Sequence, residues 1–260
     1  MRVNCFSSHH YLRHFSVASQ RWHSNREKEL FLKCGNQKNA IRNYSQQNSS
    51  KTPLLMNFKP IMTPSFWYFI QNFINSVIII KPYFDPEFTI SRFLVGAKQA
   101  LVVISDNLAQ GNIDALKGLV TEEARNEIGR NLTLFTPFQR EKLRVKMEDI
   151  ATFFAYRVGI IMNDGLECNP YFLVSQCLSV AGKRFVEITV VYWCNPLFAE
   201  LEKKMLMSEK PPNFNDFVNE KMQEEVTVCN YRFIREYTKG VESDWIVNQL
   251  NHFKYNDVFE

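Results

Sequence analysis

The hydrophobic period of this chain changes once, near Asp149, and that change limits the folds open to it. Before Asp149, apolar residues recur every three to four positions, the spacing of an amphipathic helix. After Asp149, they alternate along the chain, as Ile150, Thr152 and Phe154 do, which is typical of strands. Helices followed by a run of strands predict an α+β domain with helices packed on a curved antiparallel sheet, and we place this domain at residues 84–256.

The longest predicted helix covers residues 84–111. Asp85 is suited to capping its start, and Gly111 is suited to ending it. Its apolar stripe is wide, which predicts burial between a sheet and other helices. Gly96, in the middle of the helix, costs about 1 kcal/mol relative to alanine and so predicts the close approach of another backbone.

Shorter elements complete the predicted domain. Two further helices are expected after Thr121 and Thr136. Later strands are expected at about residues 171–180, 184–193, 226–238 and 244–254. A charged stretch containing two adjacent prolines, at about 195–225, interrupts the strands and is predicted to be an inserted loop.

The first 44 residues differ from the rest of the chain in charge. They hold eight of the 31 Lys and Arg residues and two of the 27 acidic residues, which leaves 23 bases and 25 acids in the remainder. Scattered arginines and serines without a long apolar run are typical of a mitochondrial transit peptide. We therefore predict that residues 1–44 are cleaved off. Arg42, Tyr44 and Ser45 resemble a matrix processing-peptidase site cut after Tyr44; the alternative is a basic arm that stays attached.

Residues 45–63 are polar and contain prolines without any period, so we expect a linker. Residues 64–82 then show the period of an amphipathic helix, with an apolar face made of Phe66, Phe69, Ile70, Phe73 and Val77. The stretch is too short, and too rich in amide side chains, to span a membrane. Its polar face lacks Lys and Arg, which favours contact with protein, either its own domain or a partner, over contact with lipid.

The predicted mature chain offers little for catalysis or metal binding. His252 is its only histidine. It contains no nucleotide-binding, metalloprotease or hydrolase motif. Its cysteines match no zinc or redox spacing; they are Cys168, Cys177, Cys194 and Cys229. We expect no cofactor, no metal and no DNA partner.

Three stretches resemble the family of mitochondrial m-AAA protease-interacting proteins. They are YFDPEFTISRFLVGAKQAL, RFVEITVVYW and REYTKGVESDWIVNQLNHFK, and the resemblance covers about residues 60–256. The chain departs from the family at Ser243, where the relatives have proline, and in the loop at 197–224. The resemblance implies a cone-shaped fold similar to nuclear transport factor two and to the C-terminal domain of the inner-membrane translocase motor anchor.

The same resemblance implies a function. It points to a non-enzymatic, chaperone-like adaptor in the mitochondrial matrix, peripherally associated with the inner membrane. The implied partners are subunits of the m-AAA protease and a small inner-membrane client, such as the regulatory subunit of the calcium uniporter.

Two other functions stay open from the sequence. Enzymes with the cone fold use a tyrosine and an acid together, and Tyr156 or Tyr192 with Glu187 is such a pair. A mitochondrial large-ribosomal-subunit protein shares the cone domain and links the ribosome to the inner membrane. The basic run at 139–146 suits that role, whereas the slightly negative predicted mature chain does not.

Overall fold

A computed structural model describes residues 53–162, 182–198, 203 and 225–256. The predicted transit peptide at 1–44, with Arg42, Tyr44 and Ser45, lies outside these residues. So do the strand expected at 171–180 and most of the expected insertion at 195–225.

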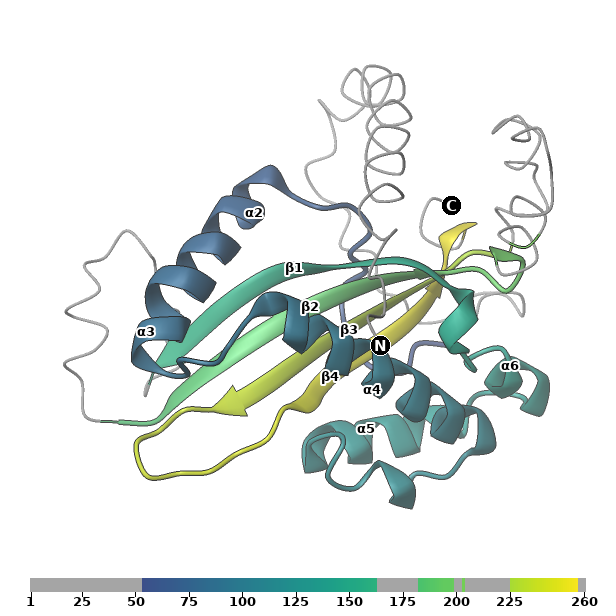
Figure 1. Cartoon of the computed structure of the whole chain (residues 1–260). Helices are drawn as coiled ribbons and strands as arrows, with labels where there is room; N and C mark the ends of the chain where they lie inside the picture. The colour runs from purple at the N-terminus through teal and green to yellow at the C-terminus, as the bar shows by residue number, and fades with distance from the viewer. Residues whose placement is uncertain (1–52, 163–181, 199–202, 204–224, 257–260) are drawn as a thin grey trace, which may run out of the picture. The chain divides into compact units, whose positions relative to one another are not determined.

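The strands form one antiparallel sheet in the order β1-β2-β3-β4 (Figure 1). They are β1 Ile150–Met162, β2 Arg184–Cys194, β3 Thr227–Glu236 and β4 Ile246–Lys254. The register between β1 and β2 shifts between Ala155 and Arg157, which marks a bulge in β1. The predicted α+β class with a curved antiparallel sheet is confirmed.

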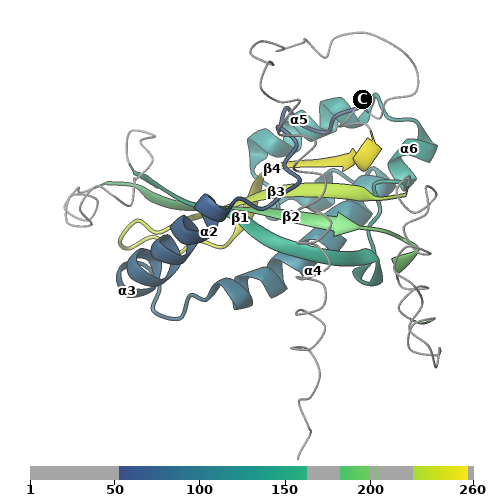
Figure 2. The ribbon, with the colours of Figure 1, turned by 90° about the horizontal axis from the view of Figure 1, so that it is seen from above.

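The named helices of the described part precede the sheet in the chain, as predicted. They are α2 Phe66–Phe73, the π-helical turn η2 Ile74–Ile80, α3 Lys81–Tyr83, α4 Ile90–Gln110, α5 Glu122–Leu132 and α6 Pro137–Glu141, with short turns η3 Asp114–Leu116 and η4 Met147–Asp149. Thr121 and Thr136 cap α5 and α6. Figure 2 shows α4 on one face of the sheet and the chain leading into α2 on the other.

Helix α4 starts later than the sequence predicted. Thr89, not Asp85, caps it, by accepting a hydrogen bond from the Arg92 backbone N–H at 3.3 Å. The Asp85 carboxylate instead contacts Arg235 on β3, and the helix cannot begin until the chain has turned away from that contact. Gly111 ends α4 in the left-handed conformation, with φ 73°, as predicted.

The main core lies between α4 and the sheet. Helix α4 contributes fully buried side chains at Leu101, Ile104 and Leu108, each worth about 1.5 to 3 kcal/mol of burial. The Tyr192 hydroxyl donates a hydrogen bond to the Ala97 carbonyl at 2.8 Å, which fixes the distance between helix and sheet. The close backbone approach expected at Gly96 is not seen: a Cβ there would meet no described atom within 4 Å, because Gly96 lies on the exposed side of α4.

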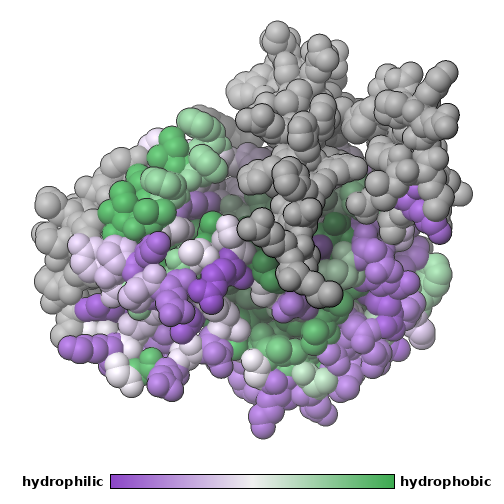
Figure 3. Space-filling view, viewed as in Figure 1, coloured by the Kyte–Doolittle hydropathy of each residue, from purple (hydrophilic) through white to green (hydrophobic). Residues whose placement is uncertain are grey.

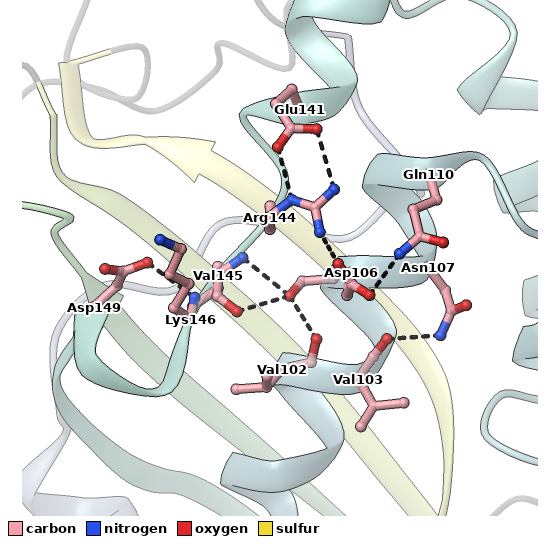
Figure 4. Close-up of polar contacts among 11 residues, drawn as sticks. Val102, Val103, Asp106, Asn107, Gln110, Glu141, Arg144, Val145, Lys146 and Asp149 are labelled. Atoms are coloured by element: carbon pink, nitrogen blue, oxygen red, sulfur yellow. Dashed lines mark hydrogen bonds and ion pairs between the residues drawn. The ribbon is translucent and has the colours of Figure 1, made fainter.

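The second half of α4 is fastened to the segment that leads into β1 (Figure 4). The buried Ser105 hydroxyl accepts a hydrogen bond from the Val145 backbone N–H at 3.1 Å. The next residue, Asp106, pairs with the Arg144 guanidinium, which also binds Glu141. These contacts set where β1 begins relative to the helix.

Residues 53–62, which we call the crossing segment, run over the sheet face opposite α4. Asn251 on β4 bonds both the Leu55 N–H, at 3.1 Å, and the Met56 carbonyl, at 2.7 Å. Further along, Asn230 on β3 bonds the N–H and the carbonyl of Ile61, at 2.7 and 2.8 Å. A linker was expected at 45–63. The described part is packed against the sheet instead. It shows no hydrophobic period because side chains of the sheet, Asn230 and Asn251, hold its backbone.

The Asn230 contact predicts a large loss on substitution. Asn230→Ala removes two hydrogen bonds at a buried site and should lower the free energy of unfolding by about 2 to 4 kcal/mol. Urea denaturation measures this, with Gln99→Ala on the exposed side of α4 as the control. A loss below about 0.5 kcal/mol would mean that the crossing segment is not held there.

His252 is the one histidine in the described part of the chain, and it is buried in β4. Its Nε2 atom lies 3.0 Å from the Tyr231 hydroxyl. Burial lowers its pKa from 6.5 to about 4. Because the unfolded chain takes up this proton near pH 6.5 and the folded chain only near pH 4, the unfolded state binds more protons between those values.

Stability should therefore fall as the pH drops from about 6.5 to about 4, by about 3 kcal/mol from this residue. His252→Gln keeps a hydrogen-bond partner for Tyr231 but does not titrate, so its stability should change less over the same range. Chemical denaturation of both proteins at pH 7, 5.5 and 4 tests this. Parallel pH profiles would contradict it.

Candidate functional site

Helix α2 and η2 turn their polar side toward the sheet. The Asn72 side chain accepts a hydrogen bond from the Val158 N–H at 2.7 Å and donates to the Ala155 and Tyr156 carbonyls, both at 3.1 Å. Asn75, one turn on, donates to the Val158 carbonyl at 2.7 Å. Among the described strands β1 lies at the edge of the sheet, and these amides satisfy backbone groups at its bulge that a neighbouring strand would otherwise pair.

The apolar side of the same helix consequently faces outward. Phe66, Phe69 and Phe73 are 79%, 71% and 59% exposed. Ile70 and Val77 are also exposed, so all five residues of the predicted partner surface lie on one outward face. Two exposed residues that the sequence analysis missed widen it. The outer face, as we call it, consists of Phe66, Trp67, Phe69, Ile70, Phe73, Val77 and Ile78.

Figure 3 shows the apolar residues of the outer face gathered over α2, beside a more hydrophilic surface. Trp67 and Ile78 were missed because neither occupies a position of the predicted apolar face. Each is an apolar residue that directly follows a residue of that face, and this adjacency is the sequence signal that could have found them. Contiguous apolar surface of this kind marks interaction sites on folded proteins. None of the helices in the described part of the chain is long and apolar enough to cross a membrane.

The outer face carries little charge. No acidic residue occurs between positions 53 and 84 of the sequence, and the basic residues there are Lys59 and Lys81, both exposed. Association through this face therefore depends on burial of apolar area, at about 25 cal/mol per Å², more than on ion pairing.

The first and third of the stretches that resemble the family contact each other just after α3. The Asp85 carboxylate lies 3.3 Å from both Arg235 and the Tyr237 hydroxyl, and burial raises the pKa of Tyr237 to about 12. The Arg235 Nε donates to the Ser243 carbonyl at 2.7 Å. The contact uses the backbone of Ser243, so it does not depend on which side chain stands at this position.

The tyrosine and acid pairs considered for catalysis separate into two cases. Tyr192 and Glu187 lie on opposite faces of β2, and burial raises the Tyr192 pKa well above its usual value. Tyr156 and Glu187 do line one hollow of about 150 Å³, on the face opposite α4. Burial also raises the Tyr156 pKa. The described residues hold no cluster of metal-ligating side chains.

The basic run at 139–146 is partly neutralised by contacts within the domain. Arg144 pairs with Asp106 and Glu141 (Figure 4), and the Lys142 ammonium lies over the Phe138 ring, 4.5 Å from its centre. The run is therefore less available to a nucleic acid than its sequence suggests.

Fold and surface together define an α+β protein that presents an apolar helix face to solvent. No family model matches the chain. It is similar to proteins named m-AAA protease-interacting protein 1, mitochondrial, from mouse (26% identical over 68% of this chain and 55% of that protein) and rat (25% over 82% and 67%). The human protein of that name is 26% identical over 68% of this chain and 55% of that protein.

The resemblance found in the three sequence stretches is thus confirmed as a distant relationship. The chain spans little more than half the length of the mouse and human relatives that it matches.

The attachment of α2 gives a direct prediction. Asn72→Ala removes three hydrogen bonds to β1 and should lower the free energy of unfolding by about 2 to 3 kcal/mol. Amide hydrogen exchange should accelerate in α2 and η2 while β2 and β3 keep their protection. Gln71→Ala, at the neighbouring position, should leave both measurements nearly unchanged. Unaltered exchange in α2 of the Asn72 variant would show that other contacts hold the helix.

Proposed function

We propose that this chain is a non-enzymatic adaptor of the mitochondrial matrix that binds the m-AAA protease at the inner membrane. The observation that carries the proposal is the outer face, an apolar surface held rigidly outward because the opposite side of its helix bonds to β1. The relatives are named for interaction with the same protease, which supports this choice of partner.

The adaptor would assist newly imported small inner-membrane proteins, such as the regulatory subunit of the calcium uniporter, in maturation, sorting or protection. Such clients carry apolar segments that aggregate in water, and an exposed apolar face offers them or the protease a compatible surface. A stable complex of ordinary size buries about 800 Å² on each partner, and seven large exposed side chains supply a substantial part of that area. Docking through the outer face would also bring the protein to the inner membrane peripherally, because the protease lies there.

The charge variant Phe69→Asp with Phe73→Asp tests this proposal. Each carboxylate placed on the outer face must be desolvated on binding, so co-purification of the m-AAA protease from detergent extracts should fall at least about tenfold. The protein should also leave the membrane fraction. Both phenylalanines are exposed, so the thermal unfolding midpoint should stay within a few degrees of the parent protein.

The control places the same charges on another exposed apolar surface. Val95→Asp with Val103→Asp changes two valines of α4 that are 61% and 46% exposed, and should leave co-purification intact. Equal loss in both double variants would point to general surface effects. Co-sedimentation with large ribosomal subunits that RNase abolishes, without the protease, would favour the ribosomal alternative instead.

A further inference from the structure

Gly96 lies on the outward side of α4, and no contact within the described part of the chain accounts for it. A glycine in the middle of a helix costs about 1 kcal/mol relative to alanine. A Cβ atom at this position would meet no described atom within 4 Å, so the domain itself leaves room for a larger residue. Glycine is favourable at such a position where the backbone of another element comes close. None of the described elements supplies that approach.

The residues beside Gly96 on the same side of α4 are exposed and uncharged. Val95 and Val103 are 61% and 46% exposed, and Gln99 between them is exposed as well. Their spacing of four residues places them in one line along the helix. Exposed valines next to a glycine offer a second helix apolar area to bury and a place for close approach. The α4 face, as we call this line, consists of Arg92, Val95, Gly96, Gln99, Val103 and Asp106.

The α4 face is complementary to itself. Val95 and Val103 lie four residues before and after Gln99, and Arg92 and Asp106 lie seven residues before and after it. A two-fold axis at Gln99 therefore places Val95 of one copy against Val103 of the other. The same axis places Arg92 of one copy against Asp106 of the other. Each contact occurs twice, as a two-fold interface requires.

The charges at the two ends of the α4 face set the direction of the pair. The Arg92 side chain is 72% exposed and that of Asp106 is 41% exposed. An antiparallel pair brings these opposite charges together, whereas a parallel pair would bring each against its own like charge. Arg92 and Asp106 already pair with Glu87 and Arg144 within the chain, so the new contacts add little affinity. They select the orientation, and burial of the valines provides the attraction.

We propose that two copies of this chain associate through the α4 face as an antiparallel pair of helices, with a two-fold axis at Gln99. Helix α4 has 21 residues, so it is about 31 Å long and about 10 Å wide. A face of this size is smaller than the about 800 Å² that each partner buries in a stable complex of ordinary size. The dimer is therefore reversible, with a dissociation constant of about 1 to 100 μM.

Pairing through α4 leaves the outer face accessible. Helix α4 packs on one face of the sheet (Figure 2), whereas α2 is bonded to β1, at the edge of the described sheet. A dimer consequently carries two outer faces. A partner with more than one binding site would be held more tightly by the dimer, by a factor of about 10² to 10⁴. The dimer itself does not depend on which partner binds the outer face.

Sedimentation equilibrium of the full chain between about 1 and 200 μM measures the dimer. Gly96→Leu places a side chain where the second helix approaches, and should weaken the dimer at least about tenfold. In the monomer the new side chain starts in open space and leucine is the better helix former, so the thermal unfolding midpoint should stay equal or rise. Asn126→Leu, at an exposed position of α5, is the matched control and should dimerise as the parent chain does.

Single cysteines test the antiparallel geometry. Gln99→Cys places the two new thiols next to each other at the axis, so mild oxidation should add a disulfide-linked dimer that the parent chain does not form. Arg92→Cys places its two thiols about 20 Å apart along the helices and should add none. Crosslinking at both positions, or at neither, would contradict the antiparallel pair.

The two double variants on the apolar surfaces separate this inference from the proposed function. Val95→Asp with Val103→Asp should abolish the dimer and keep the co-purification of the protease. Phe69→Asp with Phe73→Asp should lose the protease and keep the dimer, which also excludes self-association through the outer face. The inference is overturned if the parent chain stays monomeric up to about 200 μM, or if Gly96→Leu dimerises as tightly as the parent chain.

Discussion

The pairing of two asparagine side chains with the edge of β1 determines what this molecule shows to its surroundings. Asn72 and Asn75 satisfy backbone groups of β1 at its bulge, and this turns the polar side of the helix inward. An amphipathic helix on a folded domain usually buries its apolar side. Here the apolar side stays exposed to water, which is unfavourable in free energy. Another surface that covers this side removes that unfavourable exposure, and this favours binding.

The same face of the sheet shows how far the N-terminal part of the described chain shapes the domain. Asn251 on β4 and Asn230 on β3 form hydrogen bonds with the crossing segment. The segment leads directly into α2, which packs on β1. Asparagine suits this work because its amide presents a donor and an acceptor in the geometry of a peptide group. The outer face depends on this course of the chain.

Much of the fold followed from the sequence, and the failures have physical reasons. Periodicity identified α4, the strands β1 to β4 and five of the seven residues of the outer face, because those patterns are local. It could not say which side of α2 turns inward, since that depends on the β1 bulge. Asp85 was predicted to cap the helix because the residues around it fit a helix start. Its actual partner, Arg235, lies 150 positions away, so the local sequence could not indicate the contact.

The central claim is that Phe69 faces a partner while Tyr68, its neighbour, faces the protein's own sheet. Site-specific photo-crosslinking in intact mitochondria tests it most directly, with a photoreactive phenylalanine placed at either position. The account predicts that position 69 crosslinks to another protein, with m-AAA protease subunits or a small membrane client among the products, and that position 68 crosslinks within the chain to β1. Crosslinks from position 69 that stay within the chain would contradict it.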